Sequence, residues 1–178
     1  MSSGRLEELA HLIRKKNSVE REITSIVGRP VEKGHVGEFI AACIFGVELH
    51  KSASAKGNDG VFKSGPLVGK TVNVKWYMGS DNLLDLNPSG GTDYYLVLSG
   101  GRKESNTSRD MERPWTIDFV YLFKESELMH KLGERGVKVG VATSVRAGEW
   151  ESAEVYPTNR GPLELDDEQR RLLRLFST

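Results

Sequence analysis

The sequence predicts a single-domain α/β fold, and three observations support this prediction. Apolar residues recur with helical spacing before residue 45 and again near the C-terminal end. Between these segments, short stretches alternate apolar and polar residues as strands do. The chain has 178 residues, 38% of them hydrophobic and 28% charged, which is far from the composition of a disordered chain. We therefore expect one domain over residues 1–178, with one sizeable core.

Two helical segments are expected at the start of the chain. Apolar residues recur between Leu6 and Val27, which predicts one long helix or two shorter ones within an N-terminal segment, residues 1–30. A more apolar helix is expected from Gly34 to Phe45, with Gly46 ending it. Cys43 is the single cysteine of the chain and lies in this apolar run, so we expect it in the core.

Short strands are expected after the second helix. They are predicted at Val47–Leu49, from Val61, over 70–77 and at Tyr94–Leu98, with a loop over 78–91. In the third of these strands Val72, Val74 and Trp76 alternate with polar residues. Because side chains alternate between the two faces of a strand, Asn73 and Lys75 share a face.

The second half of the chain begins with a long polar loop, residues 99–116. Four cations in it are candidates for contacts to nucleic-acid phosphates: Arg102, Lys103, Arg109 and Arg113. Acidic residues lie between them, so a solvated loop is the alternative. Further elements are expected as a strand over 117–123, a helix over 124–134, a strand over 137–142 and a C-terminal helix over 166–176.

Charge and targeting signals exclude several classes of protein. The 25 basic and 25 acidic residues cancel, so any nucleic-acid site has to be a local patch. The sequence lacks the pattern of a signal peptide and an apolar stretch long enough to span a membrane, which predicts a soluble cytoplasmic protein with no membrane partner. Gly65–Thr71 has the wrong glycine spacing for a nucleotide-binding P-loop, and a strand follows it.

Three charged residues in the first half carry the candidate chemistry. Glu38 lies in the apolar helix, Asp59 lies in a glycine-flanked turn, and Lys75 lies two residues after Asn73 on a strand. Hydrolysis of a phosphodiester is helped most by a divalent ion that neutralises developing charge and lowers the pKa of water. Mg²⁺ prefers oxygen ligands and retains several waters, so one or two carboxylates plus substrate oxygens can hold it.

This order of residues and elements resembles the PD-(D/E)xK nuclease superfamily, over residues 34–98. The resemblance implies a restriction endonuclease-like fold, a mixed central sheet flanked by helices. It also implies a metal-dependent DNA endonuclease, with Mg²⁺ or Mn²⁺ held by Glu38, Asp59 and Asn73 and with Lys75 as the catalytic cation. Nucleases of this kind often act on DNA as homodimers, so a homodimer is a further expectation.

Asn73 departs from that superfamily, which has Glu or Asp at this position. Its amide oxygen can bind a metal but adds no charge. Glu48 and Asp93 are the nearest acids in sequence that could compensate. The alternative is a catalytically inactive module of the same fold that binds nucleic acid or a protein partner. Each of Glu38, Asp59 and Lys75 also has a simpler explanation, as a surface, turn or exposed strand residue.

A second resemblance, to a family of uncharacterised bacterial and archaeal proteins, has no function attached to it. The segments that carry it are Gly34–Ala41, Thr71–Tyr77, Asp93–Leu98, Arg113–Trp115 and Gly140–Val145.

Overall fold

A computed structural model describes residues 3–51, 57–79, 82–101 and 114–178. The helices are α1 (Ser3–Val27), α2 (Lys33–Phe45), α3 (Glu125–Glu134), α4 (Ala147–Ala153) and α5 (Asp167–Arg174), with a 3-10 turn, η1 (Gly65–Leu67). The strands are β1 (Val47–Leu49), β2 (Gly60–Phe62), β3 (Thr71–Tyr77), β4 (Leu83–Leu84), β5 (Tyr94–Ser99), β6 (Phe119–Lys124), β7 (Thr143–Ser144) and β8 (Glu154–Tyr156).

The central sheet has six strands in the order β1-β2-β3-β5-β6-β8, and β4 pairs with β7 in a separate antiparallel pair. β1, β2 and β3 form an antiparallel meander. β5 runs parallel to β3, and β6 and β8 are antiparallel to their neighbours. The predicted mixed central sheet is therefore confirmed.

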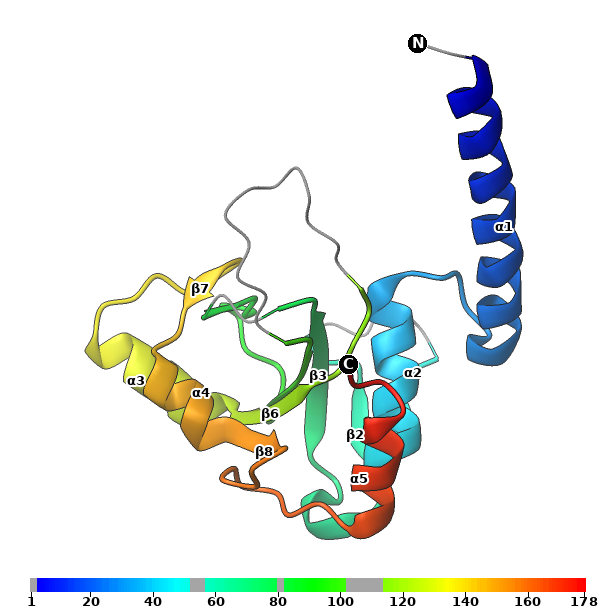
Figure 1. Ribbon diagram of the computed structural model, residues 1–178. Coiled ribbons are helices and arrows are strands. Elements are labelled where there is room, and N and C mark those ends of the chain that lie inside the picture. Colours follow the sequence, from blue (N-terminus) through cyan, green and yellow to red (C-terminus); the bar gives the residue numbers. More distant parts are fainter. Residues whose placement is uncertain (1–2, 52–56, 80–81, 102–113) are drawn as a thin grey trace.

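Helices cover both faces of this sheet, and each face has its own core (Figure 1). On one face, α2 and α5 pack over alternate residues of β3 that include Val74 and Trp76. On the other face, α3 and α4 cover Tyr95, Phe123 and their neighbours. The predicted packing of Trp76 with the apolar side of β3 is confirmed, and the flanking helices agree with the expected fold class.

The C-terminal end of α2 and the N-terminal end of α5 have common helix-capping arrangements. Gly46 ends α2 in a left-handed conformation with φ of 64°, which a glycine adopts without strain. Asp166 caps α5 by accepting a hydrogen bond from the N–H of Gln169, whose side chain returns a bond to the N–H of Asp166. Both boundaries lie within a residue or two of those expected.

Some expectations about the elements were wrong. No strand forms over 137–142, because the N–H of Val137 bonds back to Leu132 and Ala142 adopts a positive φ of 56° in a turn. Cys43 is exposed rather than in the core, because the buried side of α2 is formed by residues such as Ile40, Ala41 and Ile44.

Short elements were also missed. The sequence analysis did not predict β4, β7, α4 or β8, which are two to seven residues long. The N-terminal segment is one helix, α1, rather than two. None of the described helices combines the length and apolar character that a membrane span requires.

Candidate active site

The backbone around Asp59 joins β1 to β3. The N–H of Asp59 donates to the carbonyl of Val72 at 2.8 Å, and its carbonyl accepts from the N–H of His50 at 2.9 Å. The carboxylate Oδ2 then accepts a hydrogen bond from the N–H of Val74 at 2.6 Å. Because Val74 lies between Asn73 and Lys75, the carboxylate is fixed on β3 beside these two predicted site residues.

The charges around Asp59 are those that the sequence analysis singled out. Burial raises the pKa of Asp59, and the negative charge of Glu38 raises it further. The Val74 N–H and the positive charges of Lys75 and Arg29 act in the opposite direction. The charges of Glu38 and Lys75 therefore both act on the carboxyl of Asp59, and burial, the largest cause, leaves its pKa above the ordinary value.

Glu38 reaches this cluster from α2 and is held by Arg29. The guanidinium Nη1 donates to Oε2 of Glu38 at 2.5 Å, and the two side chains are 33% and 18% exposed, respectively. Partial burial makes this pair stronger than a surface ion pair. No sequence spacing rule links Arg29 to Glu38, because the two residues are nine apart across a break between helices.

Asn73 contributes a polar atom that has no hydrogen-bond partner among the described residues. Its Nδ2 donates to the carbonyl of Gly57 at 3.5 Å, which is a long bond. Its Oδ1 is buried and has no hydrogen-bond partner among the described residues. A buried acceptor without a donor costs free energy, and such an atom calls for a specific explanation. A bound cation would provide one.

The donor set fits a hard divalent cation. Glu38 and Asp59 offer carboxylate oxygens and Asn73 offers an amide oxygen, which are ligands that Mg²⁺ and Mn²⁺ accept. The described residues contain no group of three His, Cys, Asp or Glu side chains that could hold a metal, so a third ligand from Asn73 would be neutral. His35 lies one helical turn before Glu38, and its Nδ1 lies 3.0 Å from the carbonyl oxygen of Pro30.

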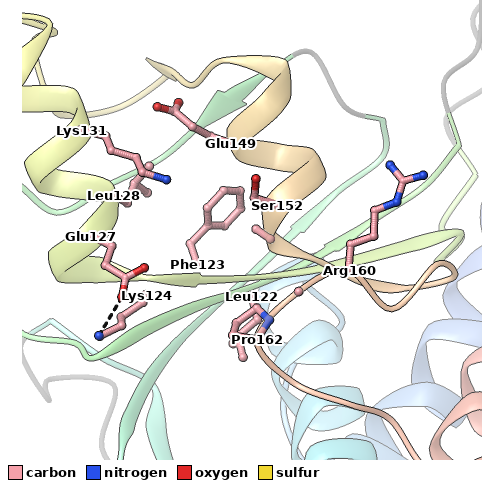
Figure 2. A pocket seen from close by; sticks show the side chains of 12 residues that line it. Leu122, Phe123, Lys124, Glu127, Leu128, Lys131, Glu149, Ser152, Arg160 and Pro162 are labelled. Carbon is pink, nitrogen blue, oxygen red and sulfur yellow. Dashed lines mark hydrogen bonds and ion pairs between the residues drawn. The ribbon is translucent and has the colours of Figure 1, made fainter.

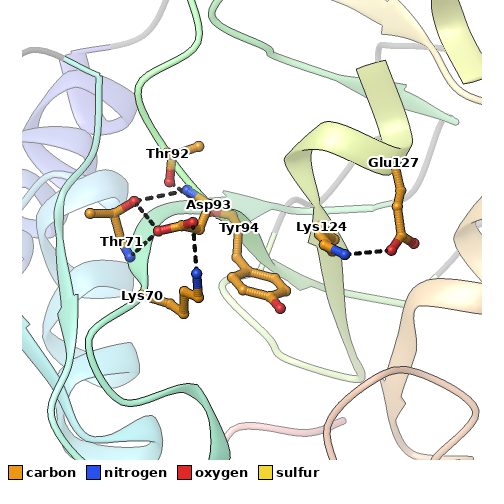
Figure 3. A network of polar contacts seen from close by, with 7 residues as sticks. All are labelled: Lys70, Thr71, Thr92, Asp93, Tyr94, Lys124 and Glu127. Carbon is orange, nitrogen blue, oxygen red and sulfur yellow. Dashed lines mark hydrogen bonds and ion pairs between the residues drawn. The ribbon is translucent and has the colours of Figure 1, made fainter. Parts of the chain in front are cut away.

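The two acids considered as substitutes for Asn73 are engaged elsewhere. Glu48 is exposed and pairs with Lys63 at 2.6 Å. Figure 3 shows Asp93 held by Thr71 and Lys70 at the start of β3. Its Oδ2 accepts from the N–H and hydroxyl of Thr71 at 2.8 and 2.9 Å, and Lys70 lies 3.4 Å from Oδ1.

The turn before Asp59 is supported by residues that the sequence analysis did not assign. Asn58 Nδ2 donates to the carbonyl of Gly91 at 2.8 Å, and its Oδ1 lies 2.6 Å from Nε2 of His50. Gly57 has a φ of 99° and lies so close to Gly91 that a Cβ would be 3.2 Å from its Cα. These contacts explain why the turn needs a small residue at position 57 and why it holds Asp59 in place.

The four cations considered for nucleic-acid contacts belong to the polar loop before Trp115. Arg102, Lys103, Arg109 and Arg113 lie outside the described residues. Trp115, which follows them, is described and packs against Trp76 with ring centroids 5.5 Å apart. The end of the polar loop is thereby attached to β3, the strand that carries Asn73 and Lys75.

A cavity of about 330 Å³ lies elsewhere, between β6, α3, α4 and residues 160–162 (Figure 2). Its floor is apolar, and most of its charged lining residues are paired: Lys124 with Glu127 at 2.8 Å, and Glu149 with Arg135 at 3.2 Å. It shares no residue with the Asp59 cluster, and its paired charges make it a weaker candidate for chemistry.

Comparison with known proteins adds no assignment. No protein-family model matches the chain, and no curated protein matches its sequence.

Proposed function

We propose that the protein is a divalent-metal-dependent DNA endonuclease and that Glu38, Asp59, Asn73 and Lys75 form its active site. The observation that carries the proposal is the hydrogen bond from the Val74 N–H to Asp59 Oδ2, at 2.6 Å. It fixes the carboxylate of Asp59 on β3 at the residue between Asn73 and Lys75, and the charges of Lys75 and of Glu38, on α2, both act on its pKa. The orphaned Oδ1 of Asn73 is a second, independent support.

Each residue has a distinct role in the proposal. Glu38, Asp59 and Asn73 would hold Mg²⁺ or Mn²⁺, which supplies positive charge beside the scissile phosphate. Lys75 would orient the attacking water or stabilise the negative charge that develops on the phosphate. Arg29 would position Glu38, since it occupies one oxygen of that carboxylate and leaves the other available.

DNA cleavage by the purified protein tests the proposal. Supercoiled and linear DNA would be incubated with Mg²⁺ or Mn²⁺, beside Asp59→Asn and Lys75→Ala variants whose folding is checked by circular dichroism. We expect metal-dependent cleavage by the wild type and its loss in both variants. A well-folded wild-type protein that cuts no DNA in either metal would contradict the proposal.

A second candidate function is a non-catalytic module of the same fold that binds nucleic acid or a protein partner. It is favoured by the Arg29–Glu38 ion pair, which neutralises one of the two acids, and by the neutral Asn73. In that case the positive charge of Arg29 takes the place of a metal ion beside Glu38. The two functions differ in a simple measurement, since the inactive module would not be stabilised against heat by Mg²⁺ or Mn²⁺, whereas the nuclease would be.

A further inference from the structure

Helix α1 leaves an apolar face in water. Figure 1 shows it projecting from the rest of the fold, beyond α2. Leu9 is 51% exposed, Ile13 is 47% exposed and Ile26 is 68% exposed. Most of the stability of protein helices comes from packing of an apolar face, and large exposed apolar patches mark interaction surfaces. α1 therefore has the form of a helix that packs against a partner.

Five of the apolar residues of α1 follow a heptad repeat. Alternating steps of three and four residues give the positions Leu6, Leu9, Ile13, Lys16, Glu20, Ile23 and Val27. This is the a/d spacing of a two-stranded coiled coil. The two central positions are charged, and Lys16 and Glu20 form an ion pair within the helix. The remaining five are apolar.

We propose that α1 pairs with α1 of a second copy of the chain as an antiparallel coiled coil whose two-fold axis passes near Ser18. In this register Lys16 faces the partner's Glu20, and Glu20 faces the partner's Lys16. Ile13 then faces the partner's Ile23, and Leu9 faces the partner's Val27. Every layer joins an a position to a d position, as antiparallel coiled coils require, and the charged layer is self-complementary.

The charges select this orientation over the parallel one. In a parallel pair in register, Lys16 would face the partner's Lys16 and Glu20 the partner's Glu20, and like charges opposed at an interface cost several kcal/mol. Charge complementarity of this kind sets register and orientation in coiled coils.

The residues that flank the heptad positions on one side point to the same orientation. Leu12, Val19 and Ile26 are apolar and lie next to the a positions. In an antiparallel pair this flank lies against the same flank of the partner, so apolar meets apolar. In a parallel pair it would lie against the opposite flank, which includes the polar residues Asn17 and Thr24.

The molecular mass in solution tests the pairing. By sedimentation velocity up to about 100 µM, we expect the wild type to be a dimer. Lys16→Glu and Glu20→Lys should each weaken it at least about tenfold, because each opposes like charges. The double variant Lys16→Glu/Glu20→Lys should restore the dimer. Arg14→Glu is the matched control, since it makes the same charge change on the outer side of the helix.

A monomeric wild type, single reversals without effect, or a double variant that stays monomeric would each overturn the proposal. Circular dichroism of every variant separates loss of pairing from loss of folding. The mass is independent of DNA cleavage, so the pairing and the nuclease function can fail separately.

Disulfide cross-linking tests the orientation. In a Cys43→Ala background, a mixture of Leu9→Cys and Val27→Cys proteins should form the mixed disulfide dimer on mild oxidation. The Leu9→Cys protein alone should not, because its two thiols would lie at opposite ends of the coiled coil. The reverse pattern would establish a parallel pair and overturn the antiparallel one.

Discussion

Asp59 and Asp93 both accept a hydrogen bond from the backbone of β3, yet their surroundings differ in a way that separates an acid paired within the protein from a candidate for function. Asp93 accepts two bonds from Thr71 and lies beside Lys70, and the N–H of Thr71 leads the contacts that hold its pKa below the ordinary value. Among the described residues Asp59 accepts one bond, from Val74, and burial raises its pKa. Asp93 is held by hydrogen bonds and by Lys70, whereas the pKa of Asp59 is governed by burial.

Neutralising each acid in turn should separate their effects on cleavage most clearly. We expect Asp59→Asn to lower the rate of DNA cleavage by at least roughly 10²–10³-fold, the scale of losing one group that stabilises the transition state. The Asn side chain can still accept the Val74 N–H, so the fold should survive. Asp93→Asn is the control, with a rate within about threefold of wild type because Asp93 lies outside the cluster. Equal losses of cleavage rate in Asp59→Asn and Asp93→Asn would show that the two acids do not differ in function.

Placing an acid at position 73 should sharpen the comparison between Asp59 and Asp93. Asn73→Asp adds a carboxylate beside Asp59, and we expect Mn²⁺ to bind roughly tenfold more tightly, because ligand charge strengthens the binding of hard cations. Isothermal titration calorimetry measures the affinity. In EDTA the same variant should be less stable than wild type, because a second unpaired carboxylate joins the cluster. Unchanged affinity would mean that position 73 does not contact the metal.

The stability of the apo protein should depend on pH with opposite signs at the two acids. Stability from Asp93, whose folded-state pKa is lowered, is present above its unfolded pKa and is lost as the pH falls through the folded value. Asp59, whose folded-state pKa is raised, favours folding below its unfolded pKa, and this is lost as the pH rises through the folded value.

Urea unfolding in EDTA between about pH 3 and pH 7 measures both effects. Relative to wild type, Asp93→Asn should lose stability as the pH rises, by about 1 kcal/mol, the net worth of a hydrogen bond. Asp59→Asn should instead gain relative stability over the same interval. The same sign for both variants would show that Asp59 is paired in solution as Asp93 is.

The smallest effect is expected at Glu48. Its carboxylate pairs with Lys63 on the surface, where ion pairs contribute little. Glu48→Gln should therefore leave both the unfolding midpoint and the cleavage rate unchanged within error. A large fall in cleavage would show that Glu48, rather than Asn73, completes the metal site.

The sequence was informative where local periodicity decides the structure. Alternation along β3 placed Asn73 and Lys75 on one face, and the glycine turn placed Asp59 before β2. It failed where the environment comes from distant residues. Arg29 meets Glu38 through the bend between two helices, and the partnerless Oδ1 of Asn73 depends on everything packed around it.

The same limit explains the errors in the elements. Val137 and Val139 have the composition of a strand, but they pack against the core from a turn, where bonds to Leu132 and Thr143 satisfy the backbone. α4 and β8 are short and follow one another directly, so neither offers enough residues for a period to be recognised. The apolar spacing of the N-terminal segment left one helix or two open, and the structure forms one, α1.

Gly37 allows α2 to pack closely against β3 at the candidate site. A Cβ at this position would lie 3.2 Å from Cβ of Trp76, so α2 can approach β3 this closely only because that atom is missing. Glu38 follows directly, and its distance from Asp59 is therefore set by contact between a helix and a sheet that no covalent bond joins there. A cation bound both by Glu38 on α2 and by Asp59 beside β3 would hold the helix and the sheet together. Loading the site would then slow amide exchange in α2, which makes the helix itself a reporter of occupancy.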